Sequence, residues 1–122
     1  MALKKGADVQ DRAFDFACEI IELYDRLESR GGSARVLGRQ LLRSSTSIGA
    51  NLEEADAAQS RPDFVSKCGI ALKEARESHY WLRVMHRTRK LIDADGAEHL
   101  LTESNRLIAI LTTIVRKTRA AQ

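Results

Sequence analysis

Apolar residues recur along the chain every three or four positions, which is the spacing of one face of an α-helix. The pattern stops at three short polar stretches, at Gly31-Gly32, at 60–63 and at 92–96. Glycine favours helix ends, and Ser60 followed by Pro62 is typical of a helix start. The segments between the breaks predict four helices, at about 8–30, 33–57, 62–91 and 96–119, with Ser33 capping the second and Asp93 or Asp95 capping the fourth.

Each predicted helix carries one main apolar stripe, so each needs a partner that covers it. The stripes consist, in chain order, of Val9, Ala13, Phe16, Ile20, Leu23, Tyr24 and Leu27; Leu37, Leu41, Ser45, Ile48, Leu52 and Ala55; Phe64, Cys68, Ala71, Leu72, Ala75, Leu82 and Met85; and Leu100, Leu107, Ile108, Leu111, Ile114 and Val115. The short connections predict that neighbouring helices run antiparallel. We therefore expect an all-α fold, an antiparallel up-down-up-down four-helix bundle that forms a single domain over residues 1–122.

The second helix contains an unusual run of small residues, RSSTSIGANLEEA at 43–55. At about 100° per residue, part of this run falls on the apolar stripe, so two helix backbones can approach closely there. We assign the following residues to helix packing: Ser44, Ser47, Ile48, Gly49 and Asn51. Asn51 is placed to hydrogen-bond across the contact. A ligand pocket is the alternative interpretation, and tight packing is favoured over it.

Some apolar residues do not fit the main stripes and predict a second apolar face. Phe14, Cys18 and Ile21 point away from the core side of the first helix, and Ile70, Trp81 and Val84 point away from the core side of the third. A cluster with Phe and Trp on the outside of a bundle indicates self-association. The predicted interface consists of Phe14, Ile21, Ile70, Trp81 and Val84, and the alternative is a skewed bundle with these side chains at its margin.

Composition supports a helical protein, since 43% of the residues are hydrophobic, 30% are charged and only 5% are aromatic. The net charge of +3 is modest, but the charges are unevenly placed. Basic residues gather where the first helix ends, the second begins and the third ends; they include Arg35, Arg39, Arg43, Arg83 and Arg87. The first three are spaced i, i+4, i+8 and form one outward stripe. Such a stripe fits a solvated face, ion pairs to a neighbouring subunit, or a surface that binds phosphate.

The sequence contains no recognisable pattern of a metal site or an active site. His79, His86 and His99 lack the glutamate three residues earlier that carboxylate-bridged metal bundles use, and no phosphate-binding loop or catalytic constellation is recognisable. We therefore expect no metal, no cofactor and no enzymatic activity. Cys18 and Cys68 lie far apart and are expected to be reduced thiols. The chain shows neither a signal peptide nor a membrane span, so the expected location is the cytoplasm, without a membrane partner.

The run from Gln40 to Met85 resembles a family of bacterial four-helix-bundle proteins encoded within intervening sequences of large-subunit ribosomal RNA genes. The resemblance rests on three segments, RSSTSIGANLEE at 43–54, IALKEARES at 70–78 and YWLR at 80–83. It implies a ring-shaped homopentamer. A relative in the same superfamily, the accessory protein of diversity-generating retroelements, is a basic pentamer that associates with reverse transcriptase and nucleic acid. Such a role implies a basic surface at Arg35, Arg39, Arg43, Arg83 and Arg87, and the family implies no catalytic residues.

Two functions follow as expectations. The leading one is a non-enzymatic oligomeric bundle that binds RNA, DNA or a nucleic-acid-bound partner through its basic end. The rival is a structural or protein-interaction module in which the arginines serve contacts between subunits.

Overall fold

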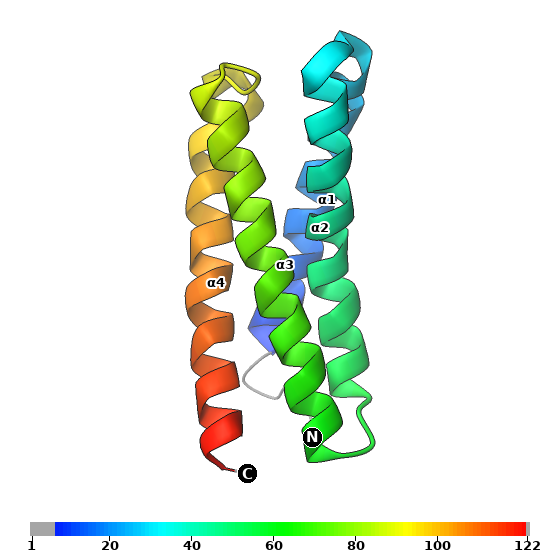
Figure 1. Ribbon diagram of the computed structural model, residues 1–122, viewed down its shortest axis with the longest axis vertical. Coiled ribbons are helices and arrows are strands. Elements are labelled where there is room, and N and C mark those ends of the chain that lie inside the picture. The colour runs from blue at the N-terminus through cyan, green and yellow to red at the C-terminus, as the bar shows by residue number, and fades with distance from the viewer. Residues whose placement is uncertain (1–6, 122) are drawn as a thin grey trace.

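The computed structural model describes residues 7–121, with side chains from Val9 onward. Its elements are α1 (Ala7–Arg30), α2 (Gly32–Asp56), α3 (Arg61–Arg87), the short 3-10 helix η1 (Asp93–Asp95) and α4 (Ala97–Ala120) (Figure 1). Within this described part there is no strand, which confirms the prediction of an all-α fold with four helices.

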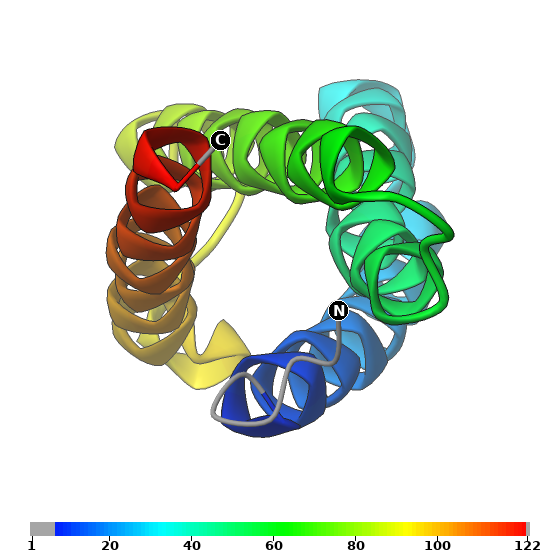
Figure 2. The same ribbon diagram turned by 90° about the horizontal axis from the view of Figure 1, so that it is seen from below.

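The four helices lie side by side as a bundle. Figure 1 shows α1 and α3 rising while α2 and α4 descend, so consecutive helices point in opposite directions. Viewed along the bundle, the helices occupy the corners of a square in chain order, with α1 and α3 on one diagonal (Figure 2). The contact between α1 and α4 is the least extensive of the four contacts between neighbouring helices.

The core forms where the predicted stripes face one another. The largest fully buried side chains come from all four helices and from the loop after α3; they are Phe16, Ile20, Leu23, Leu27, Leu41, Ile48, Leu52, Leu82, Met85, Leu91, Leu107 and Leu111. A few stripe residues are only half-buried, namely Tyr24, Leu37, Leu72, Ile108 and Ile114. The stripes therefore identify the core, and their edges lie where neighbouring helices meet.

The helix ends differ from the predictions in two places. The start of α3 is as predicted, since the Ser60 side chain accepts a hydrogen bond from the Asp63 N–H at 3.2 Å and Pro62 lies in the first turn. At α2, however, Gly31 is the capping residue, with a φ of 70°, and no side chain caps the helix. The prediction of Ser33 was wrong because the helix begins before it, at Gly32.

The connection between α3 and α4 is also more compact than predicted. The third helix ends at Arg87 and not near residue 91, because the chain turns at Arg89 (φ 61°) and carries Leu91 back into the core. Neither Asp93 nor Asp95 caps α4. Both belong to η1, and Gly96 precedes α4 with a φ of 73°.

No helix in the described part of the chain is both long and apolar enough to cross a lipid bilayer.

Candidate interaction surfaces

The small-residue run lies within one unbroken helix and packs against α3. Ser44 and Ser45 are fully buried. The hydroxyl oxygens of Ser44 and Ser78 are 2.8 Å apart across the α2–α3 contact, and each hydroxyl also contacts a carbonyl of its own helix. Buried hydroxyls are tolerated when they are hydrogen-bonded in this way. In this region Ile48 and the two serines are fully buried in the core.

Asn51 and Gly49 behave differently from the sequence prediction. Asn51 Nδ2 donates to the carbonyl and the hydroxyl of Ser47, at 2.9 and 3.1 Å, so it bonds its own helix and not a neighbour. A Cβ added at Gly49 would lie 3.8 Å from Ala13, which is an ordinary contact. The closest approach is at Gly38, where an added Cβ would lie 3.2 Å from Leu27. Sequence reasoning missed Gly38 because an isolated glycine inside a helix carries no partner information.

The predicted basic stripe of α2 divides into free and paired arginines. Arg35 and Arg39 are exposed and have no ion pair within residues 7–121. Arg43 instead pairs with Glu74, at 3.5 Å, and with Glu77. The hydrogen bond to Glu77 raises the pKa of Arg43 above its ordinary value. Arg43 is therefore partly neutralised by carboxylates of its own chain.

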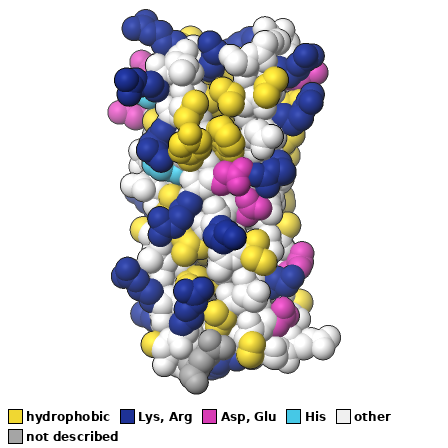
Figure 3. Space-filling model, viewed as in Figure 1, with side chains coloured by type: hydrophobic (Ala, Val, Ile, Leu, Met, Phe, Trp, Pro, Cys, Tyr) yellow, Lys and Arg dark blue, Asp and Glu magenta, His cyan; other side chains and the backbone are white. Residues whose placement is uncertain are grey.

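Arg83 and Arg87, the predicted basic residues of α3, are both exposed. The Arg83 guanidinium lies over the Tyr80 ring, 5.7 Å from its centroid, which is a cation–π arrangement. Lys and Arg side chains are spread widely over the face that α3 and its neighbours present in Figure 3. On this face the basic side chains therefore do not form one compact patch.

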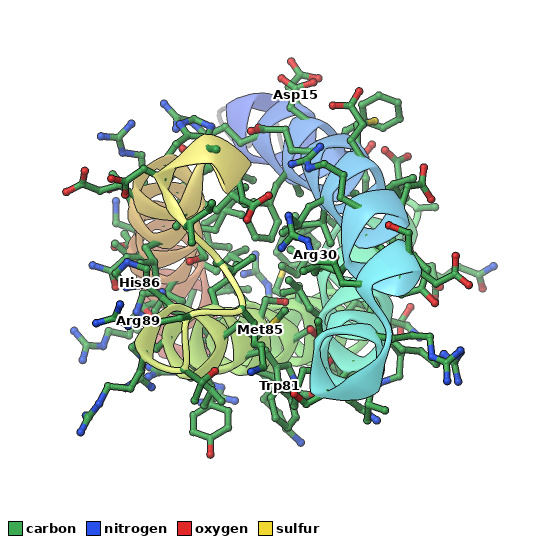
Figure 4. All side chains as sticks on the ribbon, turned by 90° about the horizontal axis from the view of Figure 1, so that it is seen from above. Asp15, Arg30, Trp81, Met85, His86 and Arg89 are labelled. Atoms are coloured by element: carbon green, nitrogen blue, oxygen red, sulfur yellow. The ribbon has the colours of Figure 1, made fainter. Side chains whose placement is uncertain are left out.

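The buried carboxylate of Asp95 forms ion pairs with two arginines near the end of α1. Asp95 is 6% exposed and accepts from Arg30 at 2.9 Å and from Arg26 at 3.4 Å, while the Ile92 N–H donates to its second oxygen. Figure 4 shows Arg30 turned inward over the end of the bundle (Figure 4). Burial alone would raise the pKa of Asp95, but these hydrogen bonds outweigh it and hold the pKa below its ordinary value. Arg26 and Arg30 therefore link the end of α1 to the segment that precedes α4.

The predicted second apolar face is exposed in part. Phe14 is 68% exposed, Ile21 45% and Ile70 38%, whereas Trp81 and Val84 are half-buried against the bundle. The structure adds three exposed hydrophobic residues that the stripe analysis did not single out, Val36, Tyr80 and Ile92. Hydrophobic side chains gather over the upper half of α3 in Figure 3, directly above a group of acidic side chains.

Trp81 also connects this apolar region to the ion pairs beside it. Its indole N–H donates to Glu77 at 3.0 Å. This bond contributes most to lowering the pKa of Glu77, with Arg43 adding to it against the opposing effect of burial. The carboxylates near Trp81 thus make structural pairs.

The histidines make separate contacts, and one of the two thiols is buried. His79 Nδ1 lies 2.8 Å from the Ser104 hydroxyl, and its pKa is lowered by burial and by Arg83. His99 contacts Glu19 at 2.9 Å, and His86 is exposed. Burial raises the pKa of the Cys68 thiol to about 11. Among the described residues, no group of His, Cys, Asp and Glu side chains could hold a metal ion.

Comparison with known proteins extends the resemblance over most of the chain. The family model for the 23S rRNA-intervening sequence protein matches residues 5–113. Among solved structures, the chain is similar to a protein of unknown function from the S23 ribosomal protein family of Bacteroides thetaiotaomicron, with 40% identity over 88% of this chain and 97% of that one and a TM-score of 0.80. No curated protein matches the chain. The chain belongs to the 23S rRNA-intervening sequence protein family.

Proposed function

We propose that this protein is a non-enzymatic, antiparallel up-down-up-down bundle of the cytoplasm that assembles with itself, most simply as a homopentamer, and binds RNA or DNA without sequence preference. The observation that carries nucleic-acid binding is the pair Arg35 and Arg39, which are exposed on one side of α2 and unpaired within residues 7–121. A planar guanidinium matches the geometry of a phosphate group, and a ring would repeat the pair in every subunit.

The experiment is a titration of the protein against structured RNA and duplex DNA at several salt concentrations. Each phosphate contact contributes ~0.9 to the slope of log K against log salt on duplex DNA. We expect Arg35→Ala with Arg39→Ala to weaken binding to every sequence equally and to reduce this slope. The matched control is Arg106→Ala with Arg116→Ala, which removes two exposed arginines of α4 that have no ion pair within residues 7–121. If the control lowers the slope as much as the test variant, binding does not depend on α2.

The second candidate function is a protein scaffold without nucleic-acid binding. It is favoured by Arg43, whose charge is already matched by Glu74 and Glu77, and by the exposed apolar side chains. Absence of binding at low salt, in a protein whose mass shows an oligomer, would select this function. A monomer that still binds nucleic acid would instead contradict the assembly and leave the α2 arginines as its binding residues.

A further inference from the structure

The outward faces of α1 and α3 carry opposite charges. The exposed acids of α1 are Asp11, Asp15, Glu22, Asp25 and Glu28, and none has an ion pair among residues 7–121. Its exposed arginines, Arg26 and Arg30, are both held by Asp95. The exposed cations of α3 are Arg61, Lys73, Arg76, Arg83 and Arg87, and no acid of α3 is exposed. We call these surfaces the α1 face and the α3 face.

Each face also has an apolar strip on the side next to α2. On α1, Gln10 is hydrogen-bonded to Glu53 of α2, and Phe14 and Ile21 follow on the same side of the helix. On α3, Trp81 lies one turn beyond Glu77, the partner of Arg43. Figure 4 shows Trp81 pointing outward between α3 and α2, and Asp15 pointing outward beyond α1 on the opposite side of the bundle.

The charged strips lie on the other side of each face, next to α4. On α1, Asp15 is three residues after Arg12, which pairs with Glu103 of α4. On α3, Arg76 and Arg83 flank His79, which bonds Ser104 of α4. The two faces therefore have the same layout, with an apolar strip toward α2 and a charged strip toward α4, but with opposite charge.

The matching groups also lie at similar heights along the bundle. Gln10 of α1 bonds Glu53, and the next residue, Glu54, pairs with Lys67 of α3, so these positions share a level. Both α1 and α3 rise from this level in Figure 1. Phe14 and Ile70 come about one turn higher, and Ile21 and Trp81 come two to three turns above them.

The spacing of the charges agrees as well. Asp15 and Glu22 are seven residues apart, and Arg76 and Arg83 are also seven residues apart. Seven residues are about two helical turns, so both pairs stay on one side of their helix and repeat at the same rise. Counted from the level of Gln10 and Lys67, Arg76 comes about one turn higher than Asp15, a difference that the long arginine side chain can span. Two copies standing side by side in the same orientation can therefore bring both carboxylates within reach of both guanidinium groups.

We propose that the α1 face of one copy binds the α3 face of a second copy, apolar strip against apolar strip and carboxylates against arginines. This inference rests on the proposed self-association and names the surfaces that perform it. Two α1 faces, or two α3 faces, would bring like charges together, which disfavours a symmetric dimer. Contact between two different faces is heterologous, and its repetition generates a ring or a filament.

The layout favours a ring. Since both apolar strips are turned toward α2, the two contacts of one subunit diverge by less than a straight angle on the α2 side, and successive copies curve in that direction. In the ring, α2 lies on the inner side, and Arg35 and Arg39 face the axis. Arg83 and Arg87 belong to the covered α3 face, and Arg43 is paired with Glu74 and Glu77. Of the five predicted basic residues, Arg35 and Arg39 therefore remain available to phosphate.

Charge reversal tests the pairing, with mass measured by analytical ultracentrifugation. We expect Asp15→Lys with Glu22→Lys to give monomers, because the two charged pairs that meet are then both basic, and Arg76→Glu with Arg83→Glu to give monomers, because both pairs are then acidic. The chain that carries all four changes has complementary faces again and regains the mass of the wild-type assembly. Arg106→Glu with Arg116→Glu, exposed on α4, is the matched control and keeps the wild-type mass.

Mixing the two double variants provides a second measurement that does not need the fourfold variant. Each variant then finds complementary faces only on the other, so the copies alternate and closed rings must contain an even number of chains. An oligomeric wild type whose mass is unaffected by either double variant overturns the pairing of faces and leaves self-association standing. A wild type that is monomeric at micromolar concentration overturns both.

Discussion

At the scale of single residues, Asp95 is notable in the described part of the chain as a charged side chain in a buried position. Its carboxylate is buried, yet it stays ionised because Arg30, Arg26 and the Ile92 N–H all donate to it. The cluster joins the end of α1 to the loop that precedes α4. Since a buried charge without partners is costly, this cluster specifies how the α3–α4 connection folds over the core.

Replacing Asp95 by Asn should destabilise the protein and change its pH dependence. We expect a loss of about 1–2 kcal/mol in the free energy of unfolding at pH 7, less than for a fully buried pair because both arginines are partly exposed. The folded-state pKa is lowered, so the stabilisation is present above the unfolded pKa, about 4, and is lost as the pH falls through the folded value. Urea unfolding at pH 7 and pH 3 measures both effects. An equal difference at the two pH values would contradict an ionised Asp95.

The glycines of α2 give a matched pair of substitutions. Gly49→Ala should raise the free energy of unfolding by up to about 1 kcal/mol, because alanine is the better helix former and its Cβ meets Ala13 at an ordinary distance. Gly38→Ala should gain less or lose stability, because its Cβ would crowd Leu27 and Tyr24. Thermal unfolding of the two variants makes the comparison. A loss at Gly49 would mean that the α1–α2 contact is tighter than the structure shows.

At the scale of elements, the helix starts differ in how their free N–H groups are satisfied. Ser60 caps α3, and removal of such a cap typically costs about 1 kcal/mol, so we expect Ser60→Ala to lower the free energy of unfolding by that amount. Ser33→Ala is the control, since Ser33 lies inside α2 and makes no capping bond, and its effect should stay within about 0.5 kcal/mol. Equal losses at both serines would refute the assignment of Gly31 as the capping residue.

The sequence predicts these elements well where one local signal decides the structure. The apolar stripes identify the core, and the Ser60–Pro62 pair identifies the start of α3, because both act through nearby residues. The α3–α4 connection could not be predicted. Its course depends on Leu91 reaching the core and on Asp95 meeting arginines more than sixty residues away in the chain.

The candidate surfaces were also predicted correctly where a local signal decides the structure, and not where distant residues meet. Helical spacing correctly places Arg35 and Arg39 outside the bundle, and it identifies Phe14 and Ile21 as exposed. Spacing does not show that Arg43 meets Glu74 and Glu77, because these residues come together only when α2 packs on α3. The opposite charges of the α1 and α3 faces likewise become visible only after pairing has removed Arg26 and Arg30 from the charges of α1.

At the scale of the whole molecule, the two thiols report on different events. Cys68 is buried with a raised pKa, so it should react with thiol reagents only after unfolding. Cys18 is exposed on the α1 face and should react quickly in a monomer. We expect its labelling rate to fall as protein concentration rises and assembly covers that face. Cys18→Ser should abolish the fast phase. A rate that is independent of concentration would contradict burial of the α1 face in the assembly.

The position of Trp81 has an optical consequence. It is the single tryptophan of the chain, half-buried on the α3 face, with its indole N–H bonded to Glu77. The intrinsic fluorescence of the unmodified protein therefore comes mainly from one known position. A neighbouring subunit that covers it would exclude water and shift the emission to shorter wavelength, whereas nucleic acid bound at α2 would leave it unshifted. One emission spectrum can thus separate assembly from ligand binding without a label.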